Sequence, residues 1–273
     1  MYRHVVIWRL KDGLENPAAV KAGIRTSLEG LVGTVPGLLR AKVYADAADA
    51  ATVMLDALFV SPDALAAYAT HPAHVAAAET FVKPFVVSRT AFDCAGGSEL
   101  DELIYERRSI RAFRPEEPPR ALVDEVVKAG LLAPTGRNRQ STVVIRLDDP
   151  EIREAVRAKN EEIRGAPPAG RVNDPFYAAP VMLLVVADTA NDTAVYDGSL
   201  ALGNMMLKAH ELGLAACWIH RAKPEIDSPL GRKILARAGL DGAYEGVGHL
   251  ALGYAACPLP APHPYNPARY RAV

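Results

Sequence analysis

The sequence lacks the residue patterns that mark several common classes of protein. Its three cysteines show no C-x-x-C spacing, so neither a disulfide framework nor a zinc knuckle is indicated. No G-x-G-x-x-G follows a strand and no G-x-x-x-x-G-K occurs, which argues against a Rossmann dinucleotide site and a P-loop. His71 and His74 lack the third and fourth ligands that a zinc or iron site needs. We therefore expect no metal site.

A strong net charge and a long apolar run are also missing. Acidic and basic residues nearly cancel, 32 against 31, so no global field favours nucleic acid or an anionic membrane. The longest apolar run, Ala178 to Ala187, is too short to span a bilayer, and the N-terminal run is too short for a signal peptide. We expect a soluble cytoplasmic protein whose partner is a small molecule.

The length of 273 residues suits two domains, each large enough to bury a core of its own. Gly96-Gly97-Ser98 is the best candidate for a flexible joint, so the domains are expected at residues 1–97 and 98–273. Period-two and period-three-to-four apolar patterns predict the order β-α-β-β-α-β in the first domain. The predicted strands are 5–8, 38–44, 52–60 and 85–92, and the predicted helices are 20–35 and 61–68.

The second domain mixes helices and strands, which makes the whole chain an α+β protein. A long helix from Leu200 to Leu212 is apolar on more than one face, and Gly213 ends it, so it should be buried on two sides. Five prolines between Pro258 and Pro267 predict an extended tail that cannot fold alone. Further helices are expected at 122–131 and 150–164, and strands at 141–147, 181–187, 214–220 and 248–254.

Cations are dense in the short stretch from Glu106 to Phe113. Its guanidinium groups offer rigid forks of donors and its serine adds a hydroxyl, which suits a doubly charged phosphate. The stretch resembles the R-R-S-x-R-x-F motif of the flavin-dependent nitroreductase family, and the resemblance covers roughly the last two thirds of the chain. It implies that Arg107, Arg108 and Ser109 grip the phosphate of FMN. It also implies that Arg111 approaches N1 and O2 of the flavin.

A second motif follows the helix that ends before Pro134. Ala133 to Gln140 is similar to the A-P-S/T-x-x-N-x-Q loop of nitroreductases, which in relatives crosses the dimer interface and touches the flavin of the other subunit. Proline and glycine fix the shape of such a loop, and polar side chains can match the edge of the flavin ring. The resemblance implies five contacts with the cofactor: Pro134, Thr135, Gly136, Asn138 and Gln140.

Later segments resemble the same family. Asp197, Ala201, Asn204 and Leu207 match D-x-x-x-A-x-x-N-x-x-L of the central dimer helix, and the segment before His220 matches G-L-x-x-C-W-I. By this resemblance, the main chains of His220 and Arg221 face the flavin, and Arg269 and Arg271 of the tail lie near its phosphate. Relatives place a lid near residues 166–170, and nearby Asn173 could reach the flavin's pyrimidine edge, although we do not count it as a contact.

The resemblance implies an FMN-dependent oxidoreductase that is a homodimer with shared flavin sites. NAD(P)H would deliver hydride to N5 of FMN, and a small oxidant would then take its place. No triad, paired-carboxylate or metal spacing stands out elsewhere, which agrees with chemistry carried out by a cofactor. Nitroarenes, quinones, activated alkenes and free flavin are all open as acceptors. Relatives that dehalogenate tyrosines or consume the flavin itself also stay open.

The first domain carries a different motif. His4 and the run from Tyr68 to His74 resemble the stress-responsive dimeric α/β-barrel domain, in which two ferredoxin-like sheets close into one barrel. A plant member of that family cyclises a linear polyketide, and its tyrosine and last histidine fall on Tyr68 and His74. The resemblance thus makes these two residues candidate catalytic residues.

The interpretation that we favour is structural. In it, His71 and His74 cap a helix and tie it to the sheet, and neither Tyr68 nor His74 faces a pocket. In two alternatives, the barrel binds a hydrophobic metabolite while the flavin domain senses redox state, or it cyclises or holds an aromatic intermediate that the flavin domain modifies.

Overall fold

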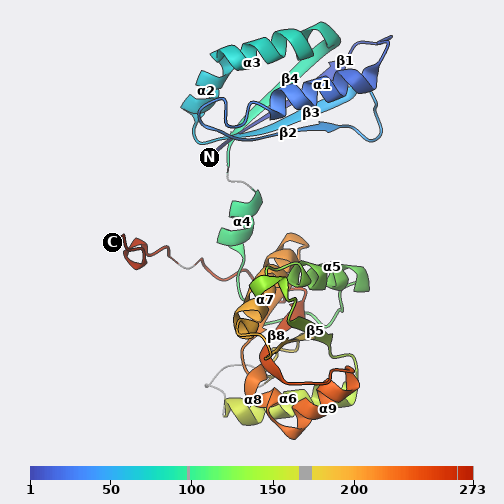
Figure 1. Ribbon diagram of the computed structural model, residues 1–273, viewed down its shortest axis with the longest axis vertical. Coiled ribbons are helices and arrows are strands. Elements are labelled where there is room, and N and C mark those ends of the chain that lie inside the picture. The colour runs from blue at the N-terminus through green and yellow to red at the C-terminus, as the bar shows by residue number, and fades with distance from the viewer. Residues whose placement is uncertain (97–98, 166–173, 263, 273) are drawn as a thin grey trace. The chain divides into compact units, whose positions relative to one another are not determined.

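The computed structural model describes residues 1–96, 99–165, 174–262 and 264–272 (Figure 1). The chain forms two compact units, Met1–Glu102 and Leu103–Val273. The middle and end of the expected joint, Gly97 and Ser98, lie outside the described residues, as do segment 166–170 and Asn173. Within the described ranges, no helix is both long and apolar enough to cross a membrane.

The first unit is an antiparallel sheet of four strands in the order β2-β3-β1-β4. Side chains on β1 alternate, since Val6 and Trp8 are buried whereas Ile7 is 44% exposed. Helix α1 begins after Asn16, whose side chain accepts a hydrogen bond from the N–H of Ala19 at 3.0 Å. The elements are β1 (Tyr2–Leu10), α1 (Pro17–Glu29), β2 (Leu38–Ala45), β3 (Thr52–Phe59), α2 (Pro62–Thr70), α3 (Pro72–Ala77) and β4 (Val86–Ala95).

The sequence analysis missed one helix of this unit. Pro72 cannot continue α2, because it lacks an N–H, but it suits the first turn of a new helix. Helix α3 therefore begins directly after α2, with His71 between them. Figure 1 shows the helices of this unit together on one side of the sheet. The side chains beneath them form a single apolar core that includes Ile24, Leu55 and Phe59.

The second unit is also built on an antiparallel four-stranded sheet, in the order β5-β6-β8-β7. Residues of β6 alternate between two apolar cores. Met182 and Leu184 face the core of α6, α8 and α9, whereas Leu183 faces the core of α5 and α7. The elements are α4 (Glu99–Glu106), α5 (Arg120–Leu131), β5 (Thr142–Arg146), α6 (Pro150–Arg164), β6 (Val181–Asp188), α7 (Ala194–Glu211), β7 (Ala215–Ile219), α8 (Ala222–Ile226), α9 (Pro229–Arg237) and β8 (Tyr244–Gly253).

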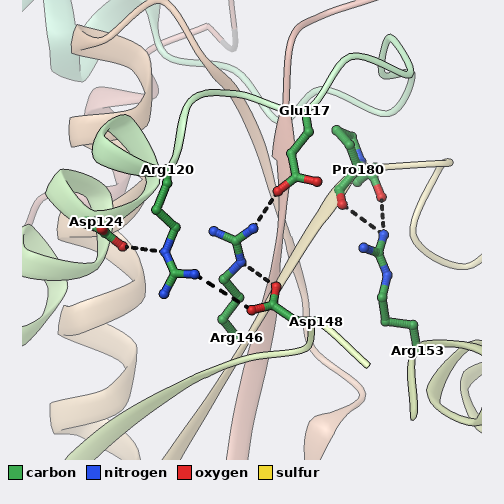
Figure 2. Close-up of polar contacts among 8 residues, drawn as sticks. Glu117, Arg120, Asp124, Arg146, Asp148, Arg153 and Pro180 are labelled. Atoms are coloured by element: carbon green, nitrogen blue, oxygen red, sulfur yellow. Dashed lines mark hydrogen bonds and ion pairs between the residues drawn. The ribbon is translucent and has the colours of Figure 1, made fainter. Parts of the chain in front are cut away.

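Charged residues hold β5 at the edge of the sheet (Figure 2). Arg146 pairs with Glu117 and, at 2.5 Å, with Asp148. Arg120 at the start of α5 reaches the same Asp148 at 3.9 Å. Arg153 of α6 donates to the carbonyl of Pro180 at 2.8 Å. The predicted α+β architecture is thus confirmed, and helices cover both faces of this second sheet.

Candidate functional site

The arginine-rich stretch after α4 lies along the edge strand β7. Ser109 forms a parallel bridge with Ala216, and the N–H of Ile110 donates to the carbonyl of Ala216 at 3.1 Å. Phe113 is buried and bridges Ala255 on the other side. This stretch has no helix or strand of its own. The backbone hydrogen bonds and the buried side chains nevertheless fix the backbone that carries its arginines.

A cavity of about 270 Å³ lies beside this stretch, between Arg107 and the C-terminal end of α7. Among the described residues, Nη1 of Arg107 has no hydrogen-bond partner, although the atom is buried. A buried donor without a partner costs about 1–3 kcal/mol, and more when it is charged. This atom is therefore suited to an anionic ligand that the chain itself does not supply. The other lining residues are Arg108, Ile110, Met206, His210, Gly213, Leu214, Ala215, Ala216, Ala255 and Leu259.

Arg108 binds its own chain in this structure. Its guanidinium donates to the carbonyls of Tyr105 at 2.6 Å, Arg107 at 3.0 Å and Pro260 at 3.2 Å. The side chain thus joins the end of α4 to the start of the tail. This role differs from that of Arg107, whose Nη1 is unused.

Three guanidinium groups lie within electrostatic reach of Cys217, the middle residue of β7. Burial raises the pKa of the Cys217 thiol. The positive charges of Arg111, Arg221 and Arg107 oppose this rise, so all three lie within electrostatic reach of the sulfur. His220, the residue between β7 and Arg221, is exposed. Positive charge therefore gathers near Cys217 of β7.

Arg221 is held by buried polar groups from three elements. Its Nε donates to Oδ1 of Asn160 at 3.1 Å, and its Nη2 donates to the carbonyl of Pro175 at 3.0 Å. Asn160 in turn donates to Glu225 at 2.5 Å, and Nε2 of His249 lies 2.9 Å from the same carboxylate. Asn160, Glu225 and His249 are fully buried. Burial lowers the pKa of Arg221, and the nearby groups of Tyr177, Cys217 and Glu225 partly oppose this shift.

The loop from Pro134 to Gln140 has an unusual backbone. Arg137, Asn138 and Gln140 have φ angles of 55°, 54° and 52°, in the left-handed region that side chains rarely adopt. Gly136 is required for space, because a Cβ there would lie 2.1 Å from Oγ1 of Thr193. Strained conformations of this kind persist only when their surroundings fix them, and they concentrate at functional sites.

Asp197 of α7 is the residue that fixes this loop. Its buried carboxylate accepts hydrogen bonds from the N–H of Gly136 at 3.0 Å, the hydroxyl of Ser141 at 2.7 Å and the hydroxyl of Thr193 at 3.1 Å. The sequence analysis noted Asp197 only as part of a pattern and did not single out Ser141 or Thr193. The sequence did contain a signal for the contact between Thr193 and Asp197, because the threonine comes four residues before an aspartate in the first turn of a helix.

One chain does not bring the two motifs together. Arg107 lies at the C-terminal end of α7, whereas the loop lies at its N-terminal end beside a separate cavity of about 280 Å³ that Thr135 and Gln140 line. A helix of 18 residues is about 27 Å long, at about 1.5 Å per residue. In the tail, the hydrogen bonds of Arg269 and Arg271 to described residues are local, to Asn266 and Tyr270.

The structure also places the predicted residues of the first unit. His71 caps α3, since its Nδ1 accepts from the N–H of Ala73 at 3.2 Å, as we expected of a structural histidine. Nδ1 of His74 lies 3.3 Å from the carbonyl of Ala69. However, Tyr68 and His74 both line a cavity of about 770 Å³. The expectation that they face no pocket is therefore wrong, because α2 and α3 do not close on the sheet at this point.

Comparison with protein-family models finds a match for each of the two units. The family model described as the nitroreductase family matches residues 104–254, and the model of the stress responsive A/B barrel domain matches residues 2–95. The chain belongs to the nitroreductase family. Its first unit is a stress-responsive A/B barrel domain preceding the nitroreductase part, as the sequence motifs predicted.

A curated protein and several solved structures are similar to the second unit of this chain. A Methanothermobacter thermautotrophicus protein named NADH dehydrogenase/NAD(P)H nitroreductase is 32% identical over 127 residues, which are 44% of this chain and 61% of that protein. The match thus spans less than two thirds of this relative. A Desulfitobacterium hafniense nitroreductase crystallised with bound FMN is 26% identical, with a TM-score of 0.58 over 65% of this chain and 100% of that one. A Bacteroides fragilis nitroreductase with bound FMN shares the fold at 24% identity, a TM-score of 0.58 and the same coverage.

Within the described residues, no group of three or more histidine, cysteine or acidic side chains could hold a metal ion. The second unit does bring together the cations near Cys217, the buried network of Asn160, Glu225 and His249, and the Asp197 cluster that holds the loop.

Proposed function

We propose that the protein is an FMN-dependent oxidoreductase that takes hydride from NAD(P)H and reduces a small oxidant such as a nitroarene, a quinone, an activated alkene or free flavin. The observation that carries this proposal is the buried, unpartnered Nη1 of Arg107 beside a cavity in the family's phosphate motif. A phosphate group would satisfy that donor with a charge-assisted hydrogen bond. The relatives with bound FMN support the same cofactor.

Each part of the chain has a defined task in this proposal. Arg107, Arg108 and Ser109 hold the phosphate, and the main chains of His220 and Arg221 border the flavin ring. Arg111 and the other cations near Cys217 stabilise negative charge on the ring, since fixed positive charge favours an anion in a site shielded from water. When bound, FMN supplies the hydride-accepting centre. The loop residues Pro134, Thr135, Gly136, Asn138 and Gln140 and the tail residues Arg269 and Arg271 complete the site.

We further propose that two chains share each flavin site. The two motifs lie at opposite ends of α7, so a second chain is needed to bring a loop to the cations of the first. Apolar side chains that a dimer would cover are exposed on α7, where Tyr196 is 72% and Leu200 49% exposed. Removal of the tail from Pro258 onwards should loosen both dimer and flavin binding. A truncated protein that sediments as a dimer with full flavin content would contradict this role of the tail.

The decisive experiment identifies the chromophore. Purified protein is denatured, and the mass of the released flavin is measured. We expect FMN and not FAD, because the motif provides for one terminal phosphate and the sequence has no dinucleotide fingerprint. Bleaching of the flavin absorbance by NADH or NADPH under argon then shows the electron donor. Release of FAD, or no flavin even after incubation with FMN, would overturn the proposal.

A further inference from the structure

The first unit contains a large cavity between its helices and its sheet. Its volume of about 770 Å³ is within the range of small-molecule sites, about 300–1,000 Å³. It lies between the helices and the sheet face to which Val6, Trp8 and Leu55 belong, and Leu65 and Val82 close it from the helical side. Most of its wall is apolar. None of its residues belongs to the flavin site proposed above.

Tyr68 gives the cavity a hydrogen-bond donor that the protein does not use. The residue is only 3% exposed, and its ring contacts Phe59 at a centroid distance of 5.1 Å and His74 at 4.0 Å. Its hydroxyl makes no hydrogen bond to any described residue, but the oxygen is not sealed within the protein, so it opens onto the cavity. Burial raises the pKa of Tyr68 to about 12, so the hydroxyl keeps its proton at neutral pH.

Most of the charged side chains that line the cavity already have partners. His4 pairs with Asp93, and Lys83 pairs with Glu79 at 2.5 Å. Arg89 of β4 also lines the cavity, yet in the described part of the chain its side chain has no hydrogen bond or ion pair. Its charge opposes the rise in the pKa of Tyr68 and adds to the lowering of the pKa of His74 by burial, so it lies near both side chains. The groups left for a ligand therefore include one cation, Arg89, and the neutral hydroxyl donor of Tyr68.

We propose that this cavity binds an apolar carboxylic acid, with its hydrocarbon or aryl body against Trp8, Leu55 and Leu65 and its carboxylate between the Tyr68 hydroxyl and Arg89. A carboxylate can accept hydrogen bonds from both groups at once. Arg89 is exposed, so water solvates it when no ligand pairs with it; its charge nevertheless attracts a carboxylate and repels a cation. The wall supplies the affinity through apolar burial, and the two polar groups select the acid.

The test is calorimetric titration of the full-length, flavin-loaded protein with decanoate and, separately, with decanol. We expect one saturable decanoate site per chain and weaker binding of decanol. Arg89→Gln should weaken decanoate binding at least tenfold and change decanol binding less than twofold. Tyr68→Phe, which keeps the ring, should weaken decanoate binding about fivefold. The matched control is Arg9→Gln, which removes an exposed arginine of the same sheet that does not line the cavity.

A cavity-filling variant shows where the probe binds. Leu65 is partly buried in the wall, so Leu65→Trp should block decanoate while circular dichroism and flavin absorbance stay unchanged. Decanoate that binds this folded variant as tightly as the wild type would place the site elsewhere and overturn the proposal. The same conclusion follows if the wild type shows no saturable binding, or if Arg89→Gln and Arg9→Gln bind decanoate equally well.

Discussion

The two units differ in how their sheets are covered, and the difference decides where each can hold a ligand. In the first unit β1 alternates, with Trp8 buried beneath the helices and Ile7 44% exposed on the other face. In the second unit β6 is buried on both faces, and Leu183 and Leu184 face separate cores. A sheet that is packed on both faces leaves space for a ligand only at its edges and at helix ends. The first unit has a large cavity within one chain, whereas the proposed flavin site needs residues from two.

The units also differ in what they bury. The second unit buries Glu225, His249 and Asn160 completely, whereas the polar groups of the first unit's cavity border open space. Buried polar groups stabilise a fold only when their partners remain in place, because an unpaired buried charge is costly. Stability should therefore be sensitive to substitution of such fully buried groups, and ligand binding to substitution of the cavity-lining groups of the first unit.

The largest effect on stability is expected from Glu225→Ala. This change leaves His249 and Asn160 without their shared partner, so the free energy of unfolding should fall by about 3–5 kcal/mol. Urea denaturation followed by circular dichroism measures it. The control is Asp227→Ala, which removes an exposed partner of Lys223 and should cost less than about 1 kcal/mol. Equal losses in the two variants would show that the buried contacts do not stabilise the second unit.

Arg107→Ala should have the next largest effect, on cofactor affinity. Loss of one charge-assisted hydrogen bond weakens binding by about 1.5–3 kcal/mol, which fluorescence titration with FMN measures as roughly a 10- to 150-fold rise in Kd. Arg120→Ala is a matched control, because Arg120 is exposed and pairs with Asp124 and Asp148 outside the cavity (Figure 2). Unchanged FMN affinity in Arg107→Ala would remove the main support for the phosphate site.

Sequence patterns predicted the two folds, but they did not predict which residues distant in the sequence contact one another or where a cavity forms. The apolar run before Ala187 predicted a strand at 181–187, and the structure buries nearly all of β6, because a continuous apolar run is typical of a strand covered on both faces. The cavity behind Tyr68 was missed, since a cavity depends on how far helices such as α3 stand from the sheet, and periodicity does not report that distance. Ser141 and Thr193 were missed for a similar reason. Their common partner Asp197 is 56 and 4 residues away, and only the fold reveals the first of these contacts.

The pH dependence of the free energy of unfolding should show a smaller effect that comes from His74 in the first unit. Burial lowers the pKa of His74 in the folded protein, so the folded state favours neutral imidazole. The stabilisation is present above the unfolded histidine pKa of about 6.5 and is lost as the pH falls through the lower folded value. Below about pH 6.5 the wild type should therefore lose stability relative to His74→Gln. Urea denaturation across this range measures the difference. A gap between the two proteins that stays constant with pH would show that His74 does not titrate on unfolding.

The smallest effect is expected from His74→Ala on the flavin reaction. His74 is held by the carbonyl of Ala69 and stacks on Tyr68, and its contacts given by the structure all lie within the first unit. We propose that the flavin domain spans residues 98–273 and binds FMN without the barrel. Quinone reduction by NAD(P)H is measured for the full-length protein, His74→Ala and the 98–273 fragment at equal flavin occupancy. The folded variant should lose some stability but keep the wild-type rate within about twofold.

A tenfold loss, about 1.4 kcal/mol of transition-state stabilisation, would mean that the barrel takes part in the reaction. Loss in the fragment alone would instead indicate that the barrel supports the dimer, because the residues that line the flavin cavity are unchanged in it.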